Sequence, residues 1–342
     1  MNNETPDANA MPPLAVLVQM TFGSILSQAL SVAAKLGVAD LLAEGPKTAN
    51  EIAARTGAHA PSVFRLLRTL SQNGVLVRDS ESRFSNTAIS ELLRSDHPKS
   101  FRAIVHMMGD KEHWMAIGNM EHSVMTGECG FDNAFGKSLF EHLAEQPETA
   151  SVFDDAMTNM SNSIGRAAVT SYDYSDVDSV ADIGGGHGLL LSIVLEANPH
   201  LKGYLFDQPH VVEGARHPEA LGVADRTEIV AGSFFEDIPV EADLYMMKHI
   251  IHDWNDEESV AILSNIAESA KPGARLLLVE TVVEEEDVPS LSGIMDLNML
   301  AMTSGRERTE AEYKDLMDRS GFRFVRVHDT GSPMNLVEGE RI

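Results

Sequence analysis

A glycine-rich turn between two apolar segments constrains the fold of this chain more than any other stretch. The apolar segment 180–183 leads through Gly184-Gly185-Gly186-His187-Gly188 into the apolar segment 189–195. This pattern predicts a strand that is buried on both faces, a tight turn and a buried helix. Glycine lets the backbone approach a ligand closely, and the free N–H groups of the following helix favour an anionic ligand group. The spacing does not match the dinucleotide pattern G-x-G-x-x-G.

Strands and helices alternate along the rest of the C-terminal half. Further strands are predicted at 201–206, 228–230, 242–248, 275–280 and 322–327, the last of them antiparallel. The alternation predicts a mostly parallel sheet with helices on both faces, which binds ligands beyond the carboxyl ends of its strands. Five polar residues fall at or just past these ends: Asp182, Asp207, Ser233, Lys248 and Glu280. We therefore expect a site at this edge, where Asp207 can accept hydrogen bonds from a ribose diol.

His252 follows the strand that ends at Lys248, just before a helix start at residues 256–258 that is rich in acidic side chains. An imidazole beside a ligand site can act as a general base, because its ordinary pKa lies near neutrality. Glu280 and Glu307 can hold and polarise the ring, as in a base oriented by a third group. Asp253 and Asp256 are close in sequence, but a helix start explains them better than a Mg²⁺ site, so we predict no metal.

The N-terminal part is predicted to be helical over residues 14–42, with apolar side chains on more than one side. Such helices favour a subunit interface or burial within one domain. Thr48 and Glu51 form a capping-box pattern before a first helix, Pro61 begins a second, and Asn73-Gly74 starts a hairpin. This order predicts a winged helix. DNA binding through its second helix is one interpretation; a pure packing module is the one we favour, since fold does not fix function.

Net charge, cysteine content and the length of apolar runs bear on the partners and the location of the protein. The formal charge of −26 argues against binding of nucleic acid or of an anionic membrane. The single Cys129 cannot form an internal disulfide, which fits a reducing compartment, and the first residues do not resemble a signal peptide. The longest apolar runs are far too short to span a bilayer. We therefore predict a cytoplasmic protein without nucleic-acid or membrane partners.

Five segments together resemble the caffeate/hydroxyindole-type (COMT-like, class I) O-methyltransferases, in their order and spacing. These are Asp182-Ile183-Gly184-Gly185-Gly186-His187-Gly188, Phe206-Asp207-Gln208-Pro209, Gly232-Ser233-Phe234-Phe235, His252-Asp253-Trp254 and Gly305-Arg306-Glu307-Arg308-Thr309. The winged-helix segment matches as well. The resemblance implies a Rossmann-like class I methyltransferase domain of the α/β class, preceded by a helical, winged-helix dimerisation domain that also closes the active site of the partner. We place a disordered N-terminus at 1–13, the dimerisation domain at 14–100, a helical region at 101–172 and the methyltransferase domain at 173–342.

The resemblance also implies the chemistry: transfer of a methyl group from S-adenosylmethionine (SAM) to a hydroxyl of a small aromatic metabolite, releasing S-adenosylhomocysteine, in a homodimer of secondary metabolism. His252 would be the base, flanked by Glu280 and Glu307. The cofactor would contact two sets of residues, one at the glycine turn and one at the other strand ends: Asp182, Gly184, Gly186, Asp207, Gly232, Ser233, Phe234 and Lys248. The acceptor would be bordered by Phe153, Met157, Met295, Asn298 and Met302.

One residue departs from the family pattern. Ser233 stands where plant members usually carry an Asp near the adenine, although a hydroxyl can still hydrogen-bond the ring. Three alternatives stay open: non-methylating chemistry on the same fold (hydroxylation, decarboxylation or cyclisation), N-methylation, and a DNA-binding regulator. Phe153 and Met157 also lie at helical spacings that favour a hydrophobic core, although flexible methionine can line an adaptable pocket.

Overall fold

The computed structural model describes residues 11–284 and 290–342. The chain divides into two compact units, residues 1–110 and 111–342. The predicted boundaries at residues 100 and 172 differ from this division, because the helices that follow residue 110 pack against α17 (Ser292–Met302) near the C-terminus. Most of the predicted disordered N-terminus, residues 1–10, lies outside the described residues, and a helix already begins at Pro13.

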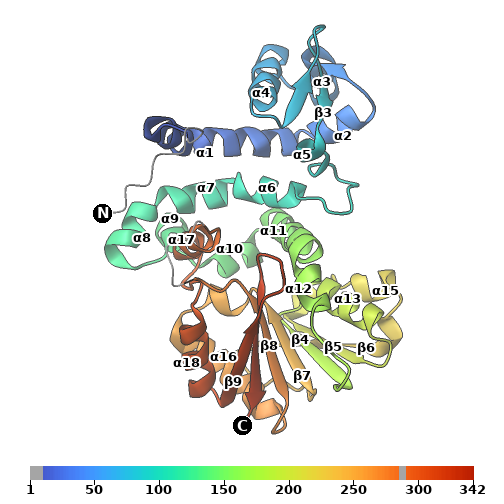
Figure 1. Ribbon diagram of the computed structural model, residues 1–342, viewed down its shortest axis with the longest axis vertical. Helices are drawn as coiled ribbons and strands as arrows, with labels where there is room; N and C mark the ends of the chain where they lie inside the picture. Colours follow the sequence, from blue (N-terminus) through green and yellow to red (C-terminus); the bar gives the residue numbers. More distant parts are fainter. Residues whose placement is uncertain (1–10, 285–289) are drawn as a thin grey trace, which may run out of the picture. The chain divides into compact units, whose positions relative to one another are not determined.

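The first unit contains the helix–turn–helix and hairpin that the sequence predicts. Thr48 and Glu51 form the expected capping box, with Thr48 Oγ1 accepting from Glu51 N at 3.3 Å. The three short strands pair in the order β1-β3-β2. The elements are α1 (Pro13–Lys35), α2 (Val38–Ala43), β1 (Lys47–Thr48), α3 (Ala49–Thr56), α4 (Ala60–Gln72), β2 (Leu76–Arg78), β3 (Arg83–Asn86), α5 (Ala88–Glu91) and α6 (Arg102–Met108) (Figure 1).

Helix α1 corrects one expectation. It is 23 residues long and apolar enough to cross a membrane by length and composition alone, so the prediction that every apolar run is too short was wrong. Within the unit, large apolar side chains along this helix stay exposed, including Leu14, Leu17, Met20, Phe22 and Ile25. A contiguous exposed apolar face of this kind marks a surface that another surface covers.

Basic side chains of the winged helix are engaged in contacts within the first unit. Lys47 and Arg55 form ion pairs with Glu44 at 3.2 and 3.3 Å. The guanidinium of Arg78 lies 4.9 Å from the ring centroid of Phe64, a cation–π distance. These contacts occupy charges that DNA binding would direct at phosphates.

The second unit is a seven-stranded sheet with helices on both faces. Its elements are α7 (Lys111–Gly118), α8 (Met120–Thr126), α9 (Gly130–Phe135), α10 (Leu139–Glu145), α11 (Pro147–Met160), the π-helix η1 (Ser161–Gly165), α12 (Arg166–Thr170), β4 (Ser179–Ile183), α13 (Leu189–Ala197), β5 (Lys202–Asp207), α14 (Pro209–Val212), α15 (His217–Ala220), the 3₁₀ turn η2 (Ala224–Arg226), β6 (Thr227–Ala231), β7 (Leu244–Lys248), the 3₁₀ turn η3 (Ile251–Asp253), α16 (Asp256–Ser269), β8 (Arg275–Glu280), α17, α18 (Glu310–Arg319), β9 (Phe322–His328) and β10 (Asn335–Arg341).

The strands run in the order β6-β5-β4-β7-β8-β10-β9. β6, β5, β4, β7 and β8 are parallel, and β10 joins antiparallel between β8 and β9. Ile262 and Leu316 of α16 and α18 pack on one face, and Val169 and Leu191 of α12 and α13 on the other (Figure 1). The predicted mostly parallel sheet is thus confirmed. The sequence prediction included β9 but not β10.

Candidate active site

The glycine turn has the geometry of a cradle. Gly184, Gly186 and Gly188 have φ angles of 73°, 59° and 80°, which side chains with a Cβ rarely adopt. Gly184 N donates to Phe206 O at 2.8 Å, so the turn is fastened to the end of β5. A Cβ on Gly186 would point into open space, whereas one on Gly184 would strike the side chain of Ile250. The backbone at Gly186 is therefore accessible to a ligand.

Two carboxylates and a lysine border this turn. Asp207 Oδ2 accepts from Gly186 N at 2.8 Å and Oδ1 accepts from Gln208 N at 2.7 Å. Asp182 is buried, and its Oδ2 has no hydrogen-bond partner among the described residues. Burial, together with the charge of Asp207, raises the pKa of Asp182 to about 7. Burial lowers the pKa of Lys248 to about 8, against the opposing charges of Glu280 and Asp182.

Phe234, which is predicted with Ser233 to border the adenine, contributes a ring beside the glycine turn. Its Cε1 lies 3.8 Å from the place where a Gly184 side chain would begin. Ser233 Oγ accepts from Phe235 N at 3.3 Å and lies just past the end of β6. Gly232 packs against the ring of Phe206, and a Cβ on this residue would lie 2.7 Å from that ring. This close packing requires a glycine, and the contact of Gly232 with the cofactor stays a prediction.

His252 is held by carboxylates from two other elements. Its side chain is buried, and Nδ1 lies 3.0 Å from Glu307 Oε1 and 3.8 Å from Glu280 Oε2. Glu280 Oε1 accepts from Ile250 N and Ile251 N at 3.1 and 3.0 Å, so it also fixes the turn that carries the ring. With Nδ1–H donating to Glu307, the Nε2 lone pair is left for a substrate proton. The predicted group of three residues is therefore assembled.

The electrostatics of this cluster favour a basic imidazole. Burial lowers the pKa of His252, but Asp253, Glu280 and Glu307 together outweigh it and raise the pKa to about 9. Burial raises the pKa of Glu280 to about 7 and that of Asp253 to about 6. Second oxygens of Glu280 and Glu307 have no hydrogen-bond partner among the described residues. The cluster can therefore accept a further proton or a polar ligand group.

The loop before α18 is fitted onto the backbone of the His252 turn. Gly305 lies so close to it that a Cβ would collide with His252 O and the backbone of Asp253 and Trp254. Arg308 is fully buried and donates to Ile251 O at 2.9 Å and to Trp254 O at 2.8 Å. These contacts give a physical reason for Gly and Arg in the Gly305–Thr309 segment. The loop thereby fixes the distance between Glu307 and His252.

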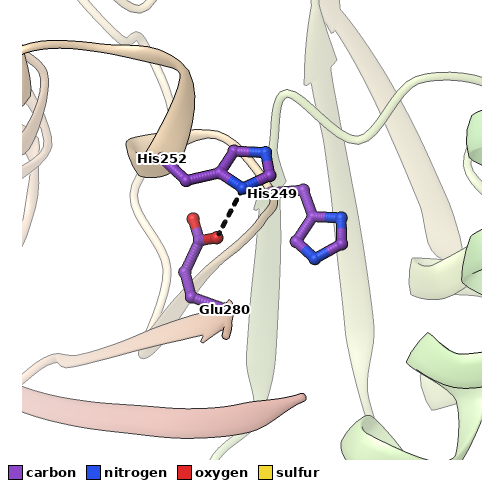
Figure 2. Close-up of side chains that lie close together, drawn as sticks. All are labelled: His249, His252 and Glu280. Carbon is purple, nitrogen blue, oxygen red and sulfur yellow. Dashed lines mark ion pairs between the residues drawn. The ribbon is translucent and has the colours of Figure 1, made fainter. Parts of the chain in front are cut away.

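The cluster His249, His252 and Glu280 offers three ligand atoms that lie within 4.8 Å of one another (Figure 2). The rings of His249 and His252 are stacked, with centroids 4.6 Å apart and planes 19° apart. Lone pairs of nearly parallel imidazoles point along their planes and do not converge on one ion, as metal coordination requires. A metal would require one ring to rotate, and the independence of the site from metal stays a prediction.

The predicted acceptor residues come from α11 and α17. Phe153 packs edge-on against Phe140 at 6.4 Å, and Met157 and Met295 are half-buried. Asn298 has a buried Oδ1 without a partner among the described residues. Met302 is instead buried among Phe131, Leu139 and their neighbours, as a member of a hydrophobic core. Its contact with the acceptor stays a prediction.

Trp254 connects the two sides of the site and was not singled out by sequence reasoning. Its ring stacks on Phe140 at 5.6 Å and meets Phe234 edge-on at 5.9 Å. Through Phe140, which packs on Phe153, it joins the helices predicted to border the acceptor to the residue predicted at the adenine. Its position in the His252-Asp253-Trp254 segment was the sequence signal that could have identified it. Arg308 was also missed, because a charged side chain is expected to be exposed. His249 was missed because no local sequence pattern distinguishes it.

Comparison with known proteins agrees with this geometry. The family model of the O-methyltransferase domain matches residues 117–323, and that of the O-methyltransferase dimerisation domain matches residues 18–96. The chain belongs to the O-methyltransferase family. It is therefore a methyltransferase enzyme with the class I fold and an N-terminal dimerisation domain, as the resemblance implied.

Two relatives are similar to this chain over 90% or more of its length. The phenazine O-methyltransferase PhzM of Lysobacter antibioticus is 41% identical over 341 residues, covering 99% of both chains. The 8-amino-8-demethylriboflavin N,N-dimethyltransferase of Streptomyces davaonensis is 33% identical over 314 residues, covering 90% of both.

Two solved structures extend the comparison. That of LaPhzM has a TM-score of 0.93 at 40% identity and covers 97% of this chain and 100% of its own. That of NcsB1 from neocarzinostatin biosynthesis, in complex with SAM and 2-hydroxy-5-methyl naphthoic acid, has a TM-score of 0.82 at 33% identity and the same coverage.

Proposed function

We propose that this O-methyltransferase uses SAM to methylate a hydroxyl of a flat, fused-ring aromatic metabolite of secondary metabolism, with His252 as the general base. The single observation that carries this proposal is the buried His252 ring with Nδ1 3.0 Å from Glu307. A carboxylate in that position selects the tautomer whose Nε2 can accept a proton.

The strand-end residues fit the cofactor. SAM supplies a methyl group that its sulfonium already activates. Asp207 retains lone pairs on both carboxylate oxygens for the ribose hydroxyls, and the backbone at Gly186 faces open space. The unpartnered Oδ2 of Asp182 can accept from the ammonium of the amino-acid end. Phe234 and Ser233 would border the adenine, and Lys248 would line the pocket.

Proton removal follows from the basicity of His252. A phenol has a pKa of about 10, and His252 has a pKa of about 9, so transfer between them is nearly balanced. Glu307 and Glu280 stabilise the imidazolium that results. The remaining work of the chain is to align the acceptor oxygen with the methyl group and to exclude water.

The acceptor class is argued from the lining and from the relatives. Phe140, Phe153 and Trp254 present aromatic surface, while Met157 and Met295 can adapt to a flat ring. Asn298 Oδ1 offers an unpartnered acceptor for a polar substituent. One relative is named for phenazine and one structure holds a naphthoic acid. These observations support a hydroxylated polycyclic aromatic compound as the acceptor.

Assembly follows from the exposed face of α1. Its apolar side chains lie partly within the segment that matches the dimerisation domain. We propose a homodimer formed through the N-terminal helices. The cytoplasmic location and the absence of nucleic-acid and membrane partners remain predictions. Failure to shift duplex DNA in a gel at low salt would support the prediction for nucleic acid, and a salt-dependent shift would contradict it.

The test of this function uses labelled SAM and a panel of phenols, flavonoids, quinones and hydroxyphenazines. We expect methyl transfer and release of S-adenosylhomocysteine with a fused-ring phenol. His252→Ala should bind SAM as the wild type does but lose turnover, whereas His200→Ala, exposed and remote in the loop before β5, should keep it. Turnover that survives in His252→Ala would contradict the base assignment.

N-Methylation is the second candidate, favoured by the N,N-dimethyltransferase among the relatives. Presenting amino and hydroxyl forms of the same ring system to the enzyme separates the two. Conversion of the substrate without consumption of SAM would instead indicate the non-methylating alternative.

A further inference from the structure

His249 has a strained backbone at the active site. Among the described residues that are not glycine, positive φ angles occur at Ser82, with 61°, and at His249, with 52°. Ser82 lies in the turn between β2 and β3, where such angles are common. His249 directly follows β7 and Lys248, where a left-handed residue persists only if its surroundings hold it there.

The left-handed turn places two groups at once. His249 N donates to Val279 O at 3.2 Å, and the next two N–H groups, of Ile250 and Ile251, donate to Glu280. The ring of His249 then lies against that of His252, with centroids 4.6 Å apart (Figure 2). One backbone conformation therefore supplies both the anchoring of Glu280 and a flat surface for the imidazole of His252.

We propose that His249 is a positioning residue whose ring, stacked on His252, holds the base in the orientation that proton transfer needs; this rests on the proposed function. Burial lowers the pKa of His249 well below its ordinary value, so its ring is neutral. A neutral aromatic ring stabilises the cation that forms on His252 when it accepts a proton. The charged groups that face His252 are Glu280, Glu307 and Asp253, and Lys248 acts on His249.

The experiment compares three substitutions at His249. His249→Asn and His249→Gly tolerate the left-handed conformation but remove the ring. His249→Phe keeps a flat ring and removes both nitrogens. Ser82→Gly is the matched control, since it relaxes the other strained position, which belongs to the first unit. For each we would measure the melting temperature, SAM binding, kcat on the high-pH plateau and the titration of the His252 ring by nitrogen-15 NMR.

We expect His249→Asn and His249→Gly to fold with melting temperatures equal to or above that of the wild type, to bind SAM, and to lose roughly 3- to 30-fold in kcat. The titration of His252 should move to lower pH in both. His249→Phe should keep most of the activity, and Ser82→Gly all of it.

Three results would each overturn the inference. The first is a His249→Asn variant in which both kcat and the titration of His252 are unchanged, and the second is a folded His249→Phe variant that loses as much activity as His249→Asn. The third is wild-type activity that a chelator removes and Zn²⁺ restores, which would make His249 a metal ligand. The NMR titration needs no acceptor. If no acceptor is methylated, the proposed function fails while the titration still tests His249.

Discussion

Replacing Glu307 with glutamine preserves the shape of the side chain and removes its negative charge. The carboxylate oxygen lies 3.0 Å from Nδ1 of His252, and both side chains are buried. A hydrogen bond to a charged group contributes about 1.5–3 kcal/mol. Since 1.36 kcal/mol corresponds to one pH unit, the pKa of His252 should fall by roughly 1–2 pH units in Glu307→Gln.

The consequence depends on pH in a characteristic way. The wild-type pKa of about 9 makes the ring largely cationic at neutral pH, so kcat/KM should rise with pH toward about 9. In Glu307→Gln the rising limb should begin at lower pH. The plateau should fall by as much as roughly 10- to 100-fold, because the cation formed on His252 loses its partner. The loss should be smaller near pH 7, where the variant has more neutral imidazole.

The assay is a pH–rate profile for methylation from pH 6 to 10, with SAM saturating and its affinity measured separately. Glu310→Gln is the matched control, because Glu310 is exposed on the same segment in the first turn of α18. The control should follow the wild type throughout. A Glu307→Gln profile with the wild-type midpoint would refute the idea that this carboxylate sets the basicity of His252.

Further predictions concern the support of the base and the cofactor. Arg308→Met should destabilise the protein by about 3 kcal/mol in urea unfolding, because the carbonyls of Ile251 and Trp254 lose a buried donor; an effect below about 1 kcal/mol would contradict this. Gly305→Ala must displace the His252 turn and should lower kcat by roughly 100-fold with SAM affinity retained; an unchanged kcat would argue against this. Gly184→Ala, at φ 73° and against Ile250, should weaken SAM binding in calorimetry by tenfold or more, about 1.4 kcal/mol; wild-type affinity would contradict it. The raised pKa of His252 should stabilise the fold fully below about pH 6.5, and this stabilisation should be lost as pH rises through about 9. The free energy of unfolding of the wild type should therefore exceed that of His252→Gln by about 3 kcal/mol at most, and this difference should shrink over that pH range. A difference that grows with pH would show the opposite sign.

The sequence predicted what depends on local chemistry. The Thr48–Glu51 capping box, the glycine turn and the buried parallel strands each have a short-range signature, and the structure contains them. His252, Glu280 and Glu307 could be grouped because parallel strands bring their carboxyl ends to one edge, and the resemblance supplied the loop that carries Glu307.

The features that were missed depend on contacts between distant segments. β10 carries Glu338, Gly339 and Glu340, which weaken its strand pattern, and only its pairing between β8 and β9 establishes it. Arg308 is buried because backbone carbonyls of another segment accept from it. Met302 lies on the same helix as Asn298, and the packing of that helix places it in the core. No local pattern encodes these partners.

The central claim is that carboxylates make the buried His252 a strong base whose Nε2 accepts the substrate proton. Nitrogen-15 NMR of histidine-labelled protein with S-adenosylhomocysteine bound, with the signal assigned through His252→Gln, measures this directly. We predict a His252 pKa near 9, with the proton of the neutral ring on Nδ1. A pKa at or below the ordinary value of about 6.5, or a neutral ring protonated on Nε2, would contradict the account.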